Sequence, residues 1–168
     1  MTVFQCGDLV IYGAHGVCNI VGIEKQKLGK KYVEYYVLQP KDAAGSRFYV
    51  PTQNETAVSK LRKVLTKDEV TELLRSDAVR QSVWIDDENL RKQRYKELIS
   101  GSDKAALVSM VHCLIQHREQ QMAAGRKFHL CDENFLRDAQ KLLGGEFSLA
   151  LNIPENEVED AVRKFFEQ

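Results

Sequence analysis

The sequence has few cysteines, no net charge and no long apolar run. Its four cysteines, Cys6, Cys18, Cys113 and Cys131, show no tight pairing pattern, which favours a reducing cytosol over a disulfide framework. The apolar runs are only a few residues long, whereas a helix that spans a bilayer needs roughly 20. The start of the chain lacks a basic stretch followed by an apolar one. We therefore expect a cytoplasmic protein that is neither secreted nor inserted in a membrane.

The absence of net charge argues against a protein that coats nucleic acid non-specifically, because such proteins carry a basic excess. The 24 basic and 24 acidic side chains are, however, unevenly distributed. Basic residues outnumber acidic ones by eight to five in residues 1–62 and by ten to seven in residues 75–127. From residue 128 onward, nine acidic residues stand against four basic ones. This pattern favours a weak and local contact with DNA rather than a strong one.

Enzyme motifs are also missing. The sequence contains no phosphate-binding loop, Gly-rich dinucleotide motif, zinc-protease helix or serine elbow. Cys113 and His117 are spaced to share one helix face, and with His129 and Cys131 they form a candidate zinc site that lacks the usual Cys-x-x-Cys knuckle. We expect no catalytic residue, no metal and no cofactor, and so a protein that is not an enzyme. A metal-binding or enzymatic protein is the alternative that a zinc assay or substrate turnover would reveal.

The first 64 residues are predicted to be β structure. Short runs rich in β-branched and aromatic residues, such as 32–38 and 47–50, alternate with turns that contain Gly13, Gly16 and Gly29. The connections are too short for crossover helices. Four or five strands, spaced by about ten residues, are therefore predicted to form an antiparallel meander that closes into a small barrel.

The hydrophobic period changes at Thr66, which begins a capping-box pattern with Glu69. Apolar residues then recur at helical spacing to the end of the chain, and Gly144-Gly145 is a predicted weak point. We expect about five helices with antiparallel neighbours in residues 65–168. The predicted fold class is β + α, a small antiparallel barrel followed by an all-α domain.

The single tryptophan, Trp84, lies in a polar setting. Three acidic residues follow at 86–88, and a basic helix comes next. The basic residues of that helix are Arg91, Lys92, Arg94 and Lys96. An aromatic ring beside such a helix can stack on bases or wedge between them while the cations hold phosphates. Two plainer interpretations are open, since a lone tryptophan is commonly a core anchor and a mixed-charge run is commonly a solvated helix face.

Several motifs follow one another in a characteristic order. The amino-terminal ones are Phe4-x-x-Gly7-Asp8-x-Val10-x-Tyr12-x-x-His15-Gly16-Val17, Tyr35-Tyr36-Val37-Leu38 and Phe48-Tyr49-Val50-Pro51. The helical part adds Trp84, Arg94-Tyr95-Lys96, Ser100-Gly101 and Leu142-Leu143-Gly144-Gly145-Glu146. In this order they resemble the CarD/CdnL family of bacterial transcription regulators, over nearly the whole chain. The amino-terminal module also resembles the RNA-polymerase-interacting domain of the transcription-repair coupling factor.

The resemblance implies a Tudor-like barrel in residues 1–64 that binds the β subunit of RNA polymerase, partly by strand-to-strand contact. It implies a helical, DNA-contacting domain in residues 65–168. The family's tryptophan wedges into the minor groove at the upstream edge of the transcription bubble, a role that falls on Trp84. The implied DNA-contacting residues are Trp84, Arg91, Lys92, Arg94 and Lys96. The implied polymerase-contacting residues are Lys25, Gln26, Lys27, Arg47, Phe48, Tyr49, Val50 and Pro51.

The function implied in this way is stabilisation of promoter open complexes without reading base sequence. The protein would be a monomer, associated with the nucleoid through RNA polymerase and without membrane contact. Tyr49 and Gln26 stand where some relatives have basic residues, and the acidic residues 86–88 are additional before the basic helix. The alternative is a module that binds polymerase without touching DNA directly.

Overall fold

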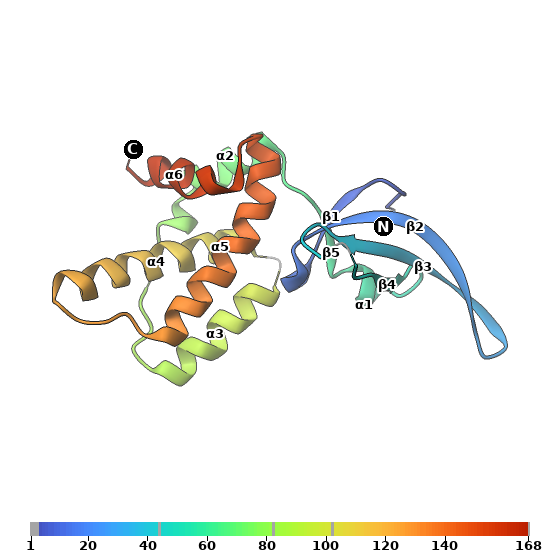
Figure 1. The fold of residues 1–168 in the computed structure, drawn as a ribbon, viewed down its shortest axis with the longest axis horizontal. Helices are drawn as coiled ribbons and strands as arrows, with labels where there is room; N and C mark the ends of the chain where they lie inside the picture. The colour runs from blue at the N-terminus through green and yellow to red at the C-terminus, as the bar shows by residue number, and fades with distance from the viewer. Residues whose placement is uncertain (1–3, 44, 82, 102, 168) are drawn as a thin grey trace. The chain divides into compact units, whose positions relative to one another are not determined.

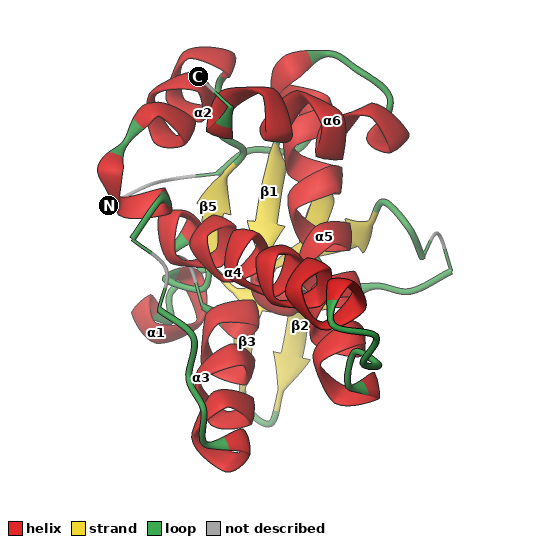
Figure 2. Ribbon diagram, turned by 90° about the vertical axis from the view of Figure 1, so that its left-hand side faces the viewer, coloured by secondary structure: helices red, strands yellow, loops and turns green. Residues whose placement is uncertain are grey.

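The computed structural model describes residues 4–43, 45–81, 83–101 and 103–167. The chain divides into an amino-terminal unit, Met1–Val64, and a carboxy-terminal unit, Leu65–Gln168, whose elements are labelled in Figure 1. Within the described ranges the strands belong to the first unit and the long helices to the second (Figure 2). The β + α layout predicted from the sequence is confirmed, and each unit has its own apolar core.

The strands of the amino-terminal unit form one antiparallel sheet. They are β1 (Leu9–Tyr12), β2 (Val17–Leu28), β3 (Lys31–Pro40), β4 (Phe48–Pro51) and β5 (Leu61–Lys63). The order across the sheet is β4-β3-β2-β1-β5, so β4 and β5 are its edges. A 3₁₀ turn, η1 (Gly13–His15), joins β1 to β2, and a short helix, α1 (Glu55–Val58), joins β4 to β5.

The sheet is open, whereas the sequence predicted closure into a barrel. Among the described residues no pairing joins β4 to β5. These two strands are only four and three residues long. The chain between them forms α1, whose Ala57 and Val58 pack on the apolar core of the unit. A helix therefore covers part of the core that paired strands would cover in a closed barrel.

Strands β2 and β3 form a hairpin that extends past the other strands (Figure 1). Pairing with β4 covers only part of β3, whereas the β2–β3 pairing continues to Leu28 and Lys31. The turn between them has Gly29 at a φ of 65°, which suits glycine at the first central position of a two-residue hairpin turn. Residues 24–34 are thus a two-stranded ribbon, which we call the distal ribbon.

Apolar residues from all five strands fill the core of the amino-terminal unit. The buried members of this core are Phe4, Val10, Cys18, Ile20, Tyr36, Leu38, Val50 and Leu61. Burial raises the pKa of the Cys18 thiol to about 11, so this sulfur stays a neutral thiol at physiological pH. All four cysteines are free.

The carboxy-terminal unit contains five α-helices and a 3₁₀ turn in its described residues. They are α2 (Lys67–Arg75), η2 (Asp77–Val79), α3 (Glu88–Ser100), α4 (Lys104–Ala123), α5 (Leu130–Leu151) and α6 (Glu155–Phe166). Their apolar faces meet in one core around the buried Leu114, Leu136 and Phe147. None of the helices described is both long and apolar enough to cross a membrane.

Helix boundaries follow local signals in the sequence. The backbone N–H of Glu69 donates to the Thr66 hydroxyl at 3.2 Å, as predicted, and that hydroxyl in turn donates to the Glu69 carboxylate at 3.1 Å. One expectation is wrong: α5 continues through Gly144-Gly145 without a break and ends where Asn152 adopts a left-handed conformation. Burial of Gly144 and of the following Glu146 and Phe147 offsets the low helix propensity of glycine.

Candidate functional site

Trp84 lies on the segment that joins η2 to α3 and is only partly exposed. Its ring stacks on the His117 imidazole of α4, with the ring centroids 3.6 Å apart and the planes 9° from parallel. The guanidinium carbon of Arg91 lies 4.5 Å from the centre of the Trp84 ring. Contact with an aromatic face and a cation holds the indole in one orientation against the helical core.

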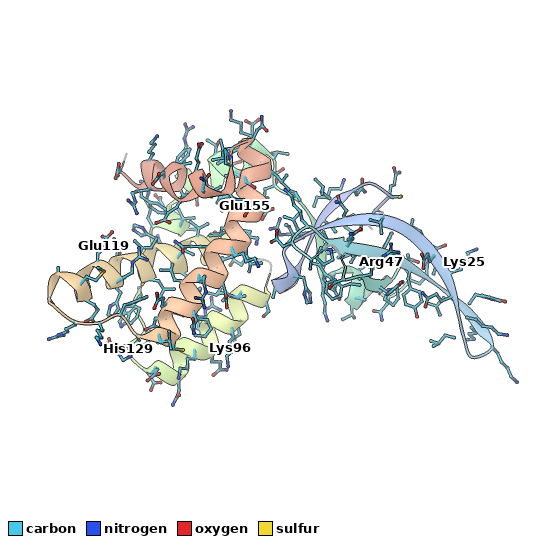
Figure 3. All side chains as sticks on the ribbon, in the orientation of Figure 1. Lys25, Arg47, Lys96, Glu119, His129 and Glu155 are labelled. Atoms are coloured by element: carbon cyan, nitrogen blue, oxygen red, sulfur yellow. The ribbon has the colours of Figure 1, made fainter. Side chains whose placement is uncertain are left out.

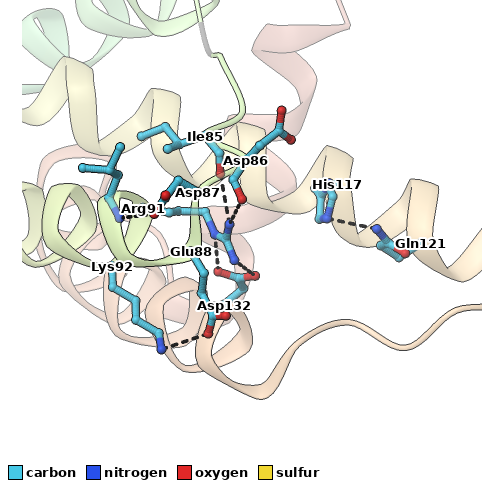
Figure 4. A network of polar contacts seen from close by, with 10 residues as sticks. Ile85, Asp86, Asp87, Glu88, Arg91, Lys92, His117, Gln121 and Asp132 are labelled. Carbon is cyan, nitrogen blue, oxygen red and sulfur yellow. Dashed lines mark hydrogen bonds and ion pairs between the residues drawn. The ribbon is translucent and has the colours of Figure 1, made fainter.

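Arg91 is buried, with only 5% of its surface exposed. Its Nε and Nη2 donate to the two carboxylate oxygens of Asp132 at 2.9 and 3.0 Å, and its Nη1 donates to the carbonyl oxygen of Ile85 at 3.0 Å (Figure 4). The position of Arg91 therefore does not support the prediction that it contacts DNA. A phosphate would need the N–H groups of the planar guanidinium, and these already donate to Asp132 and Ile85. Arg91 instead ties the Trp84 segment to α5.

The remaining basic residues of α3 point in different directions. Lys92 pairs with Glu88 at 2.8 Å, one turn earlier, and Arg94 lies 3.7 Å from Glu97. Both Arg94 and Lys96 are exposed. Residues two apart on a helix do not face each other, so Arg94 and Lys96 cannot approach one phosphate from the same side. Lys92 and Lys96, four apart, share a side.

Arg94 lies on the same side as the Trp84 segment. A shallow cavity of about 270 Å³ has both Arg94 and Val83 in its lining. Val83 precedes Trp84 and is 84% exposed, which is unusual for an apolar side chain next to a packed tryptophan. Sequence reasoning missed Val83, because an apolar residue followed by a tryptophan and an isoleucine gives no local signal that it is exposed. The structure thus brings Val83 and Arg94 to one cavity, whereas the Trp84 ring packs on His117 and Arg91, and Lys92 and Lys96 lie on another side of α3.

The contact between Trp84 and His117 predicts a pH response. Burial lowers the pKa of His117 below its ordinary value of 6.5, an effect that Asp132 opposes and Arg91 reinforces. The other charged or titratable groups that act on it are His129 and Asp86. The unfolded chain takes up this proton near pH 6.5 and the folded chain only at lower pH, so stability is expected to fall as the pH drops below 6.5.

This response can be followed by fluorescence, because Trp84 is the only tryptophan. We expect the emission of the folded wild type to change with an apparent pKa below 6.5, as a charged imidazole replaces a neutral one beside the indole. The variant His117→Phe keeps an aromatic ring without a titrating group and is expected to lose the change. A step of the same size and midpoint in this variant would show that another group is responsible.

The candidate zinc residues do not assemble into a site. Cys113 is buried in the helical unit, and His117 stacks on Trp84 while its Nε2 lies 3.1 Å from the Gln121 amide nitrogen. In the described part of the chain, no three His, Cys, Asp or Glu side chains group in a way that could hold a metal ion.

The predicted polymerase-contacting residues lie in two places of the amino-terminal unit. Arg47 precedes the edge strand β4, whereas Lys25 and its neighbours lie on the distal ribbon (Figure 3). Within β4, Tyr49 is 44% exposed and its ring meets Tyr35 edge-on at 6.2 Å. Val50 is only 1% exposed and pairs with Tyr36 of β3, so it offers almost no surface to a partner.

Register assigns these residues to opposite faces of the sheet. Val50 pairs with Tyr36, and Tyr36 pairs with Ile23, so these three side chains share the core face. By alternation Lys25 and Lys27 also lie on that face, beyond the core. Tyr49 and Gln26 lie on the other face. Phe48 points to the core face, where it packs against Tyr12 and His15 with ring centroids 5.6 and 4.2 Å apart.

Comparison with known proteins finds one family that is similar to the amino-terminal unit. Residues 4–65 match the family described as the CarD-like/TRCF RID domain. No curated protein matches the chain significantly. The matched family consists of binding domains that interact with RNA polymerase, not of enzymes. The amino-terminal unit of this chain is therefore similar to the RNA-polymerase-interacting domains of the CarD and TRCF proteins.

Proposed function

We propose that this chain is a bacterial transcription regulator of the CarD/CdnL kind, which binds the β subunit of RNA polymerase and stabilises the promoter open complex. The match of residues 4–65 to a polymerase-interacting domain carries the first part. The second part is supported by the exposed Val83, which lines one cavity with Arg94, and by the adjacent Trp84, which Arg91 and His117 hold in place. The cytoplasm, where polymerase acts, is the location this function requires.

The polymerase contact is proposed at the edge strand β4. An edge strand presents unpaired backbone N–H and C=O groups to which another strand can add. Tyr49 projects from this strand with an exposed ring, and tyrosine is among the residues enriched at binding hot spots. Arg47 adds an exposed cation just before the strand, and Pro51 ends it.

The DNA contact is proposed at the segment before α3. Apolar side chains inserted between base steps unstack and kink the duplex, at a cost of a few kcal/mol per step. Val83 and the exposed edge of Trp84 would form the wedge, and Arg94 would hold a phosphate beside it. Arg91 acts as a positioning residue, because it fixes the indole without touching DNA. Lys92 and Lys96 lie on another side of α3 and are not part of this proposed contact.

The mechanism is a shift of equilibrium. A wedge costs less where strands have already separated than in intact duplex, so the protein binds the open complex better than the closed one. Only this difference in affinity can lengthen the lifetime of the open complex. Anchoring to polymerase raises the local concentration of the helical unit, so a weak DNA contact is sufficient.

Binding to polymerase tests the first part. We expect Tyr49→Ala to weaken the affinity of the full chain for purified bacterial RNA polymerase by about tenfold or more, as for a hot-spot tyrosine. The matched control is Tyr32→Ala, which removes a ring that is 72% exposed on the distal ribbon. The measurement is a biolayer interferometry titration. Equal losses in the two variants would argue against β4 as the contact.

The half-life of the open complex tests the second part. We expect Trp84→Ala and Arg94→Ala to shorten this half-life toward its value without the protein, while polymerase binding persists. Lys96→Ala, on another side of the same helix, is expected to change it little. Circular dichroism of each variant excludes unfolding as the cause. Unchanged half-lives with Trp84→Ala and Arg94→Ala would contradict the wedge.

One observation favours a second candidate function. Trp84 packs on His117 and Arg91, as a purely structural anchor would. In that case the chain is a polymerase-binding module without direct DNA contact, and Trp84 only fixes the segment before α3. The half-life assay separates the two, because this module predicts no effect of Arg94→Ala.

A further inference from the structure

A second cavity lies within the carboxy-terminal unit, away from Trp84. It has a volume of about 540 Å³ and is lined by α4, α5 and α6. Its apolar lining includes the partly exposed Ile115, Val162 and Phe166. His112 stacks on Phe166 with ring centroids 4.1 Å apart, which links α4 to α6 at one place along it. We call this cavity the acidic groove, for the charges described below.

The acidic groove has the length of a short helix. The α4 residues that line it begin at Val108 and end at Glu119, and they recur at the three- and four-residue spacing of one helix face. At 1.5 Å per residue, this face is about 16 Å long, or three turns. The lining residues of α6 run along the whole helix, from Glu155 to its end. Both helices pack on α5.

Gly144 leaves open space in the wall of the groove. This glycine of α5 lines the cavity, and a Cβ added to it would meet nothing within 4 Å. A methyl group at this position would therefore meet no neighbour, and a longer side chain would take up space in the groove.

The rim of the groove is negatively charged. Its carboxylates are Glu119, Glu155, Glu159 and Glu167. Only one cation lines it in the described residues, Arg163, and this side chain pairs with Glu159 at 3.2 Å. Burial lowers the pKa of His112, with Glu119 opposing, so the imidazole adds no positive charge at neutral pH. Glu119 on α4 and Glu155 at the start of α6, both labelled in Figure 3, are contributed to this rim by different helices.

We propose that the acidic groove binds an amphipathic helix of a partner protein. Three apolar side chains at i, i+3 or i+4, and i+7 would fill the apolar lining, as helices do in hydrophobic grooves. Lysine or arginine residues beside them would meet the acidic rim, which selects a basic helix over an acidic one. This surface is independent of the proposed polymerase and DNA contacts.

A synthetic peptide tests this proposal. The probe is a fluorescein-labelled helix of about 15 residues, with leucine at those three positions and lysine around them, titrated with the full chain by fluorescence anisotropy. We expect saturable binding, and at least tenfold weaker binding when glutamate replaces the lysines. Gly144→Leu is expected to weaken binding at least tenfold, and Gly144→Ala only slightly. Each variant is checked for an unchanged melting transition.

Two charge reversals in the first turn of α6 form a matched pair of variants. Glu155→Lys on the rim is expected to weaken binding several-fold, whereas Glu157→Lys, outside the lining, is expected to leave it unchanged. Equal binding to wild type and Gly144→Leu would overturn the proposal. So would a wild-type dimer that Gly144→Leu dissociates, because a second copy would then be the occupant. Binding of only a small apolar dye, without the peptide, would likewise overturn it.

Discussion

Replacing Asp132 with alanine is expected to lower the free energy of unfolding of the carboxy-terminal unit by about 3–5 kcal/mol. Asp132 is 1% exposed and makes a bidentate pair with Arg91, which is 5% exposed. Removing the carboxylate leaves a buried guanidinium without its charge partner, and the desolvation of that cation is no longer compensated. Urea unfolding followed by Trp84 emission measures the effect in this unit alone, because the tryptophan lies there.

Two controls isolate the cause. Glu133→Ala removes the neighbouring, exposed carboxylate from the same first turn of α5 and is expected to cost at most about 1 kcal/mol. The double variant Arg91→Met/Asp132→Leu removes both charges and is expected to recover most of the loss, since apolar pairs can replace buried ion pairs. A double variant as unstable as Asp132→Ala would mean that packing, not the unpaired charge, sets the loss.

Glu146→Ala is the second substitution with a large expected effect, a loss of about 3–5 kcal/mol. Glu146 is 0% exposed; its carboxylate lies 3.6 Å from the Lys104 ammonium and accepts a hydrogen bond from the backbone N–H of Leu65 at 2.9 Å. The substitution leaves a buried ammonium and a backbone donor without this carboxylate, and it opens a cavity in the core. It thereby loosens the contact that fixes the first residue of the carboxy-terminal unit to α5.

Glu146→Gln separates charge from hydrogen bonding. Its amide oxygen can still accept from Leu65, so we expect a loss clearly smaller than that of Glu146→Ala, measured in the same urea titration. The exposed Glu155 supplies a control at the end of the same unit, and Glu155→Ala is expected to change stability by less than about 1 kcal/mol. Equal losses for the glutamine and alanine variants would assign the whole effect to the ion pair.

Sequence patterns predicted those parts of the fold that depend on residues close together in the chain. The Thr66 cap depends on residues three apart, and the strand alternation depends on residues two apart, so both are legible in the sequence. Barrel closure is different, because it depends on whether two short edge strands meet. The α1 helix between β4 and β5 gives no strong sequence signal, and its packing on the core decides the outcome.

The sequence shows that a basic helix follows Trp84, but it does not show that the basic residues of this helix have different surroundings. Arg91 belongs to a run of basic residues, and its buried partner is 41 residues away, which no local pattern reveals. A signal did exist: Arg91, Tyr95 and Leu98 recur at i, i+4 and i+7, the spacing of a buried helix face. A charged residue on that face indicates an ion pair in the core rather than a surface contact. The exposure of Val83 depends on tertiary packing and could not be inferred.

The shortness of β4 sets how long a partner strand can stay in place. Alternate residues of a strand direct their backbone groups to the same side, so about two of its four residues face outward, and Pro51 has no N–H to donate. At about 1 kcal/mol for each net hydrogen bond, strand addition at this edge contributes only a few kcal/mol. Such a contact dissociates readily, because weak complexes differ from tight ones mainly in their off-rates. Under the proposed function, one molecule would then leave a polymerase that has escaped its promoter and bind the next.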